Sequence, residues 1–470
     1  MPQVSAFTLI RARYDQSRSA RYDVRPATLP NSHFMATNEE LHRRRISAVP
    51  RGVSNLLGVY ADHARNAELW DVEGRRYVDF ASGIAVLNTG HVHPRMQAAV
   101  ARQLEKLTHA CFQVTPYEGY IALAERLNAL APGATAKKTI FLSTGAEAVE
   151  NAIKIARFYT NRSAVIAFTG SFHGRTQMCI GLTGKVQPYK AGFGPMPPEI
   201  FHIPFPIAYH GLTAEDSFAA LDNLFKADVD PARVAAIIIE PVLGEGGFYI
   251  APPAFLQRLR QLCDSHGILL IADEIQTGFA RTGRMFAIEH SGVEPDLMTI
   301  AKSLAGGVPI SAVIGKAPIM DAPPPGGLGG TFAGSPLGCA AGLAILDVIR
   351  EENLLERARV IGERLVSRLK SLQAKLPCIG DVRGLGAMVS MELVKNRDAN
   401  SPDADLTKAL TQLAGKKGLI LLSCGVRANV IRFLAPLTIS DALIDEGLQI
   451  VEDSLNELTA ERRGAVAAAG

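Results

Sequence analysis

The chain has 470 residues, more than the roughly 250–300 that one hydrophobic core organises, so two or more domains are expected. A hydrophobic fraction of 47% and a charged fraction of 20% are typical of a globular protein, and a net charge of +3 gives no reason to expect nucleic acid or an anionic membrane as partner. The six cysteines are scattered without CxxC spacing, which predicts reduced thiols in a cytoplasmic protein and no metal site. No apolar stretch approaches the roughly 18 residues of a membrane span.

Residues 1–34 differ in composition from the rest of the chain. They contain five arginines and no glutamate, and they lack the apolar core of a secretory signal. Enrichment in arginine and serine is also a feature of transit peptides, although Asp15 and Asp23 count against one. We expect a disordered extension, or Met35 as the natural start, rather than an import signal.

An anion site is predicted where a short strand is followed by a helix. Residues 139–143 form the expected strand, a turn of small residues follows, and the helix covers 148–159. Unpaired N–H groups at a helix start point outward, and Gly145 and Ala146 let an anion approach the backbone. Glu147 favours the first helical turn in any case, so the same pattern also fits an ordinary helix start.

Two strand ends bring an acid and an amine to one edge of the expected sheet. The runs 268–272 and 297–301 are short, apolar and bounded by turns, as buried parallel strands are. Asp273 follows the first run and Lys302 follows the second, with a loop and a short helix between them. Ligands of open α/β sheets bind at the carboxyl ends of strands. Either residue alone fits a loop cap or a solvated side chain, whereas the pair indicates a site.

The other expected elements complete an α/β chain without internal repeats. Strands are expected at 165–168, 235–240 and 310–314, helices at 255–266, 338–349, 352–374 and 404–416, and further strands within 381–393, 418–425 and 429–438. A hairpin with its turn at Glu73–Gly74 is expected within 68–94. Residues 322–336 are rich in Pro and Gly, which predicts a loop of fixed bends.

The segment ADEIQTGFARTGRMFA, followed by AKSLAGG, resembles the class-III aminotransferases, fold-type-I enzymes that use pyridoxal phosphate (PLP) and act on ω-amino groups. MATNEEL, GLILLSCG and IRFLAPLT are similar to bacterial 4-aminobutyrate aminotransferases in that family. The resemblance implies an α/β fold, with a large domain on a mostly parallel seven-stranded sheet and a smaller α/β domain. It places an N-terminal segment that packs with the small domain at 35–94, the large PLP-binding domain at 95–337, the small domain at 338–458 and a disordered tail at 459–470.

The resemblance also assigns the cofactor contacts. Lys302 would bind PLP covalently, and Asp273 would pair with the ring nitrogen. A buried carboxylate there keeps the nitrogen protonated, so that the ring can absorb electrons. An amine among apolar neighbours loses its charge readily and serves as nucleophile and base. The remaining cofactor contacts fall to Gly145 and Ala146 at the phosphate, Phe172 and Ile275 on the two ring faces, and Gln113, Gln276 and Thr331.

Substrate contacts follow from the same resemblance. Arg175, in FHGRT, would receive the carboxylate far from the amine, for which a planar guanidinium is suited. Arg432 would receive the α-carboxylate of the acceptor, since a charge among apolar residues must be paired or used. Glu245, in PVLGEGG, would be a gate that neutralises Arg432, with glycines that allow it to swing. Ile84 would form an apolar wall of the pocket, and His173 is expected to be a packing residue.

The function implied is a ping-pong transfer of the ω-amino group of 4-aminobutyrate to 2-oxoglutarate, which gives succinate semialdehyde and glutamate. Thr331, on the loop 322–336, would bind the phosphate of a neighbouring subunit's cofactor, which implies a homodimer or a dimer of dimers. One alternative is an acetylornithine or ornithine aminotransferase, since FHGRT, GEGG and DEIQTG recur there. Others are a PLP aminomutase or decarboxylase on the same scaffold, or a non-catalytic binding protein, against which Asp273 and Lys302 count.

Overall fold

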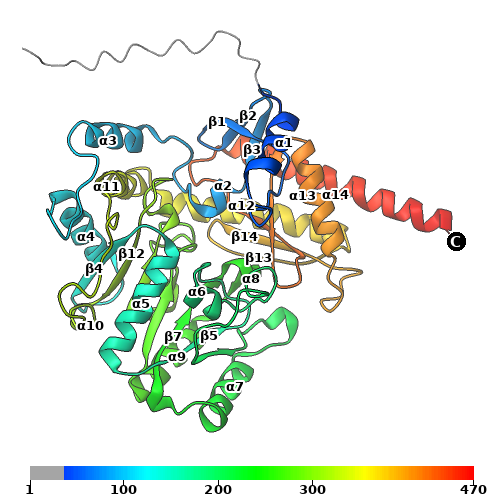
Figure 1. Ribbon diagram of the computed structural model, residues 1–470. Coiled ribbons are helices and arrows are strands. Elements are labelled where there is room, and N and C mark those ends of the chain that lie inside the picture. The colour runs from blue at the N-terminus through cyan, green and yellow to red at the C-terminus, as the bar shows by residue number, and fades with distance from the viewer. Residues whose placement is uncertain (1–35, 470) are drawn as a thin grey trace, which may run out of the picture.

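The structure, a computed structural model, describes residues 36–469, so the expectations for residues 1–34 lie outside the described residues. A large α/β domain, a smaller α/β domain and an N-terminal segment lie against one another (Figure 1). Within the described residues, no helix is both long enough and apolar enough to cross a membrane.

A seven-stranded sheet forms the centre of the large domain. Its order is β4 (Lys137–Leu142), β12 (Ser311–Lys316), β11 (Leu297–Ile300), β10 (Leu269–Asp273), β7 (Val234–Ile239), β5 (Ala164–Phe168) and β6 (Ile200–Ile203). Only β12 runs antiparallel to its neighbours, and the other pairs are parallel. The predicted mostly parallel seven-stranded sheet is therefore confirmed, and the carboxyl ends of its parallel strands meet at one edge.

Helices cover both faces of this sheet, which explains why its strands are continuous apolar runs. Successive strand residues point to opposite faces, so Ile237 and Ile238 belong to different hydrophobic clusters. One face packs against α5 (Gly145–Thr160) and the other against α4 (Glu118–Leu130), α9 (Pro253–His266) and α11 (Pro336–Glu351). Gly267 ends α9 in the left-handed region at φ +63°, as the sequence predicts for a helix stop.

The small domain contains an antiparallel sheet covered by long helices. The sheet order is β13 (Ile379–Leu385), β14 (Met388–Leu393), β17 (Val430–Phe433) and β16 (Leu422–Cys424), and the helices are α12 (Leu354–Lys375), α13 (Ala404–Lys416) and α14 (Asp441–Ala469). The tail differs from the expectation of disorder, because residues 459–469 continue α14. Alanine and arginine are strong helix formers, and they extend a helix that is already nucleated.

The N-terminal segment joins the small domain through a mixed sheet. Its strands β1 (Ala61–Arg65), β2 (Glu68–Asp71) and β3 (Arg76–Asp79) form antiparallel pairs, and β3 pairs in parallel with β15 (Leu419–Ile420). The remaining elements are α1 (Asn38–Ala48), α2 (Ser82–Ala85), α3 (Pro94–Leu104), α6 (Gln177–Leu182), α7 (Ala214–Ala227), β8 (Val242–Leu243), α8 (Gly244–Gly247), β9 (Tyr249–Ile250) and α10 (Ala317–Met320). The segment therefore precedes the large domain in sequence but belongs to the small one by pairing.

Candidate active site

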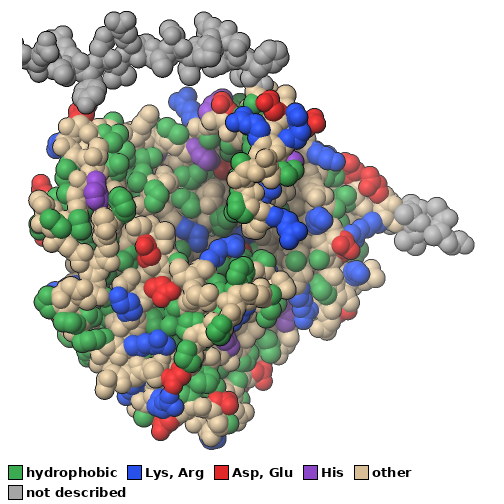
Figure 2. Space-filling view, viewed as in Figure 1, with side chains coloured by type: hydrophobic (Ala, Val, Ile, Leu, Met, Phe, Trp, Pro, Cys, Tyr) green, Lys and Arg blue, Asp and Glu red, His purple; other side chains and the backbone are tan. Residues whose placement is uncertain are grey.

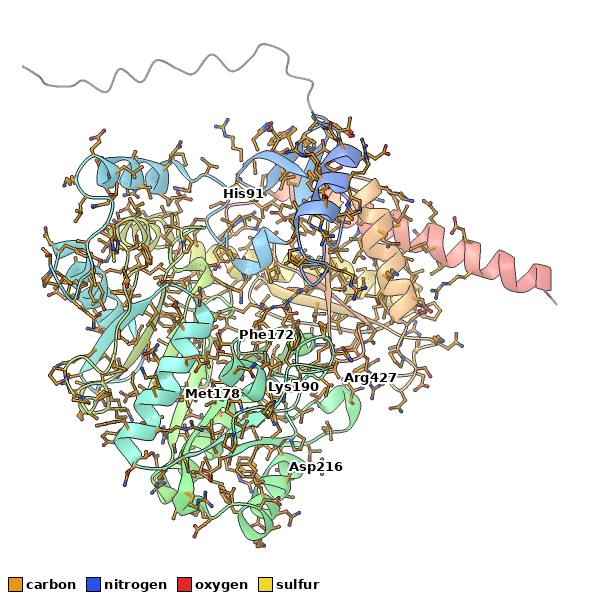
Figure 3. All side chains as sticks on the ribbon, viewed as in Figure 1. His91, Phe172, Met178, Lys190, Asp216 and Arg427 are labelled. Carbon is orange, nitrogen blue, oxygen red and sulfur yellow. The ribbon has the colours of Figure 1, made fainter. Side chains whose placement is uncertain are left out.

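A cavity of about 400 Å³ lies at the carboxyl edge of the large sheet. It is lined by residues at or just beyond the carboxyl ends of five strands, namely Ser143, Phe172, Glu240, Asp273 and Lys302. Its volume is within the range of about 300–1,000 Å³ usual for small-molecule sites. Figure 2 shows a hollow near the centre of one face, with Lys and Arg side chains beside it, and Figure 3 places Phe172 near the centre of the molecule.

The start of α5 forms an anion cradle in this cavity. Thr144 caps the helix, and the Glu147 carboxylate accepts the N–H groups of Ser143 and Thr144, each at 2.8 Å. Glu147 therefore stabilises the helix start, as its position predicted. The amides of Gly145 and Ala146 have no hydrogen-bond partner in the described chain, and both residues line the cavity. These two N–H groups and the helix dipole suit a phosphate group.

Asp273 is buried, 3% exposed, and both of its oxygens have partners. Oδ1 accepts the N–H of Ile275 at 3.1 Å and the hydroxyl of Thr299 at 3.0 Å. Oδ2 lies 2.7 Å from Nδ1 of His173. The expectation that His173 only packs is therefore wrong, because its ring orients the carboxylate predicted to meet the ring nitrogen. This contact joins residues 100 positions apart, which local sequence patterns do not reveal.

Lys302 enters the same cavity from the end of β11. Its backbone adopts φ +43°, an uncommon value for a residue with a side chain, of the kind that concentrates at functional sites. Burial lowers the pKa of the Lys302 amine, although the nearby carboxylates of Glu245, Asp273 and Glu240 oppose that effect in part. A lysine in this environment supplies a neutral amine more readily than a solvated one.

The cavity between the predicted ring-facing residues fits a flat ring. Phe172 and Ile275 both line it. A Cβ on Gly145 would lie 3.0 Å from Cδ1 of Ile275, so a larger residue here would push against that side chain. Gln276 also lines the cavity, and its buried Oε1 has no partner within the described residues. An anion cradle, a buried acid, an amine and an unsatisfied amide oxygen around one cavity together fit the phosphate, the ring and the polar substituents of PLP.

Glu245 and Arg432 form a direct ion pair beside this cavity. Arg432, on β17, is 4% exposed, whereas Glu245 lies on α8 and lines the cavity. Burial raises the pKa of Glu245, but the Arg432 guanidinium outweighs that effect and brings it below its usual value. The pair is therefore ionised at neutral pH, and each charge satisfies the other.

The glycines around Glu245, in Gly244–Gly247, pack closely against neighbouring residues. A Cβ on Gly244 would collide with the side-chain amide of Gln276. A Cβ on Gly246 would lie 2.6 Å from the carbonyl oxygen of Gly170. The carbonyl oxygen of Glu245 also accepts the N–H of Gly425 at 3.0 Å. These glycines are therefore closely packed in this structure, and the expectation that they let the Glu245 side chain swing stays a prediction.

Several predicted site residues do not line the cavity of a single chain. Ile84 is 42% exposed, and Val86 lines the cavity in its place. Gln113 and Thr331 are exposed, and the Gln113 amide donates to the carbonyl oxygen of Leu328, on the loop that carries Thr331. The roles of Ile84, Gln113 and Thr331 stay predictions.

Arg175 also lies outside the cavity lining, at an exposed position. Its guanidinium lies over the ring of Tyr189 at 5.0 Å, and it forms no ion pair among the described residues. Tyr189 also contacts Phe172, with ring centroids 4.9 Å apart. Sequence reasoning missed Tyr189, because nothing in its local pattern distinguishes it from a surface tyrosine.

Sequence reasoning also missed Glu240, which lines the cavity and is 5% exposed. A signal was available, because Glu240 directly follows the apolar strand β7. The strand-end argument that selected Asp273 and Lys302 applies to it equally.

A parallel sheet with an anion cradle, an acid and a poised amine at its carboxyl edge defines the class as a fold-type-I PLP enzyme. The family model "Aminotransferase class-III" matches residues 48–455. A 5-aminovalerate aminotransferase of Pseudomonas aeruginosa is 58% identical over 422 residues, covering 90% of this chain and 99% of that protein. A 4-aminobutyrate aminotransferase of Escherichia coli is 55% identical over 423 residues, with the same coverage of 90% and 99%.

Solved structures agree with these matches. The ornithine aminotransferase of Toxoplasma gondii superposes with a TM-score of 0.80 at 31% identity, covering 91% of this chain and 96% of that one. The chain belongs to the class-III aminotransferases. The predictions of family, fold class, transaminase activity and PLP as cofactor are thereby confirmed.

Proposed function

We propose that the enzyme transfers the ω-amino group of 4-aminobutyrate to 2-oxoglutarate, giving succinate semialdehyde and glutamate. The observation that carries this proposal is the pairing of the buried Arg432 with a carboxylate of the protein itself. A donor with one carboxylate leaves that pair intact, whereas a diacid has to break it. Such an arrangement suits an enzyme whose donor and acceptor differ by one carboxylate.

The residues of this chain have separate tasks in the reaction. PLP, when bound, supplies an electron sink for the carbon that carries the amine. Asp273 keeps the proton on the ring nitrogen, and His173 and Thr299 orient its carboxylate. With PLP bound, Nζ of Lys302 would take a proton from the amine-bearing carbon of the substrate, for which its lowered pKa prepares it.

Substrate orientation depends on two cations. Arg175 receives the carboxylate far from the amine of 4-aminobutyrate and the γ-carboxylate of 2-oxoglutarate. Arg432 receives the α-carboxylate of 2-oxoglutarate after the Glu245 side chain rotates away. An unpaired buried charge costs several kcal/mol, on the order of 3–5, so Glu245 is needed whenever that carboxylate is absent.

The complete site is proposed to need two chains, in a homodimer or a dimer of dimers. Two large apolar side chains and the predicted phosphate ligand Thr331 are exposed on or near the Pro/Gly-rich loop, which supports this proposal. Val114 is 79% exposed, Phe332 is 66% exposed, and Thr331 is also exposed. Large apolar side chains gathered at a surface are typical of an interface. A cytoplasmic location belongs to the same proposal, supported by six free cysteines.

A second candidate donor is 5-aminovalerate, which is one methylene longer. The observation that favours it is the 58% identity to a 5-aminovalerate aminotransferase. One methylene in an apolar pocket changes discrimination by only about 1–3 kcal/mol, so both donors can react in one site. Acetylornithine and ornithine differ more, because they carry polar groups beyond the amine.

The test measures single turnovers of the holoenzyme with a panel of amine donors. The change in cofactor absorption reports the rate of each reaction. We expect 4-aminobutyrate and 5-aminovalerate to react at least about tenfold faster than ornithine or acetylornithine. Faster reaction of either ornithine compound would overturn the proposal. Sustained turnover without a 2-oxo acid would instead indicate an aminomutase.

A further inference from the structure

Glu240 is a buried carboxylate to which the proposed reaction gives no task. It directly follows β7, is 5% exposed and forms no ion pair among the described residues. Its Oε1 accepts the backbone N–H of Phe172 at 2.8 Å, and its Oε2 accepts the backbone N–H of Gly244 at 2.8 Å. A carboxylate buried without a cation is costly, and these two charge-assisted bonds offset part of that cost.

The two N–H groups belong to separate segments of the active site. Phe172 lies in the loop after β5, next to His173, which meets Asp273. Gly244 is the first residue of α8 and immediately precedes the gate residue Glu245. One carboxylate thus fixes the distance between the ring-facing loop and the gate helix.

Polar contacts hold α8 at several points along its length. Its far end is held by Arg383, whose Nε donates to the carbonyl oxygen of Gly247 at 3.1 Å. Its middle is held by the bond from Gly425 to Glu245. At its first residue, the Gly244 N–H donates to Glu240, between Leu243, which pairs with Tyr249, and the gate residue Glu245. This bond is the one that connects the start of α8 to the ring-facing loop.

Electrostatics in the cavity agree with this geometry. Burial raises the pKa of Glu240 to about 7, while nearby His173 lowers it and Asp273 raises it. The two backbone N–H groups favour the ionised form, which can accept both bonds. The carboxylate is therefore compensated by the very bonds that connect the two segments.

We propose that Glu240 is a positioning residue that couples the ring-facing loop to the Glu245 gate, so that Glu245 reaches Arg432 when no second substrate carboxylate is present. The proposal rests on the gate role assigned to Glu245 above. It predicts that disturbing Glu240 changes the balance between the two half-reactions and not only their rates.

The first experiment compares Glu240→Gln with the natural holoenzyme in both half-reactions. Glutamine keeps the size and one acceptor oxygen, but it presents an amide N–H₂ to one of the two backbone N–H groups. We expect the 4-aminobutyrate half-reaction to slow about 3–10-fold more than the 2-oxoglutarate half-reaction. If the variant cannot be purified folded, Glu240→Asp takes its place, since the shorter side chain reaches only one N–H group.

A matched control comes from Glu274, which is also fully buried and accepts two backbone N–H groups, those of Ala287 at 3.0 Å and Ile288 at 2.7 Å. Burial raises its pKa to about 7 as well. Its bonds do not involve α8. Glu274→Gln should match Glu240→Gln in thermal stability and PLP dissociation constant within a few-fold, yet leave the ratio of the half-reaction rates unchanged. An equal change of that ratio in both variants would overturn the proposal.

A double-mutant cycle with Glu245→Ala separates the coupling from the gate itself. If Glu240 acts through Glu245, adding Glu240→Gln to Glu245→Ala should change the rate ratio less than twofold. If Glu240→Gln changes the ratio of half-reaction rates by the same factor with Glu245 present and with Glu245→Ala, Glu240 acts independently of the gate. That result overturns the coupling. Should Glu245→Ala leave the ratio unchanged, the gate fails, and the coupling fails with it.

Discussion

The two ends of the active-site cavity solve the problem of buried charge differently. At the cofactor end, the Asp273 carboxylate has partners on both oxygens, none of which has to change during the reaction. At the substrate end, the Arg432 guanidinium is paired with Glu245, a partner that a diacid would displace in the proposed reaction. A fixed network suits a group with one task, whereas an exchangeable pair suits a site for two substrates. The difference predicts where a substitution removes activity and where it changes selectivity.

The largest effect is expected at the cofactor end, from Lys302→Ala. Removing the only amine that lines the cavity in the described chain should slow both half-reactions equally, by about 10²–10⁴-fold, because proton transfer loses its base. Single-turnover rates with 4-aminobutyrate and with 2-oxoglutarate measure this. Lys190→Ala is the control, a partly buried lysine outside the cavity lining that should leave both rates within twofold. Normal turnover by Lys302→Ala would contradict the assignment.

At the substrate end, Glu245→Ala should act unequally on the two halves. Without Glu245, Arg432 stays buried and unpaired while 4-aminobutyrate is bound, so that half-reaction should slow about 10–100-fold more than the 2-oxoglutarate half. The comparison needs both single-turnover rates at one pH and ionic strength. Equal losses would remove the gate from the mechanism and erase the contrast between the two ends.

Arg175 offers a smaller effect, because it is exposed while Arg432 is buried. Arg175→Ala should raise KM for donor and acceptor alike by about 10–100-fold with little change in kcat, since both substrates place a carboxylate there. Arg175→Lys should recover part of this loss, and the effect should weaken with added salt, as expected of an exposed charge. A loss confined to one substrate would mean that the two do not share this cation.

The smallest effect on activity is expected from Glu274→Gln, which tests stability behind the cofactor end. The pKa of Glu274 is raised to about 7 by burial, so the folded protein binds more protons than the unfolded chain between about pH 4.5 and 7. The stability contributed by this group is therefore lost as pH rises through that window. Between pH 5.5 and pH 8, the free energy of unfolding of Glu274→Gln should rise relative to that of the natural protein, by at most about 3 kcal/mol. Thermal unfolding of both proteins across this pH range measures the difference. A constant difference across this range would show that Glu274 stays charged.

Sequence patterns predicted the elements that carry the chemistry, because strand ends and helix starts are local features. Asp273, Lys302 and the Gly145–Ala146 turn could be selected that way. His173 could not, because its partner lies 100 residues away. Nor could the packed state of Gly244 and its neighbours, since glycine in a sequence indicates freedom or close packing equally well.

Topology was predictable only in outline. Apolar runs identify buried strands, but the antiparallel direction of β12 depends on how its connections cross the sheet. The tail was expected to be disordered from its short, alanine-rich sequence, whereas the structure continues the long preceding helix α14 through residue 469. In both cases tertiary context decided what local composition left open.

The pairing of β3 with β15 has a mechanical consequence. Val78 donates to Gly418 at 2.8 Å, Phe80 donates to Ile420 at 3.0 Å, and Leu434 donates back to Phe80 at 2.9 Å. Backbone hydrogen bonds thus join the chain just before Val86 to residues 418–434, which are synthesised much later. The wall of the cavity at Val86 is also held from the other side, because Ser303, in the large domain, donates to the carbonyl oxygen of Ala85 at 2.7 Å. This wall is therefore a place where both domains bind one short stretch of chain.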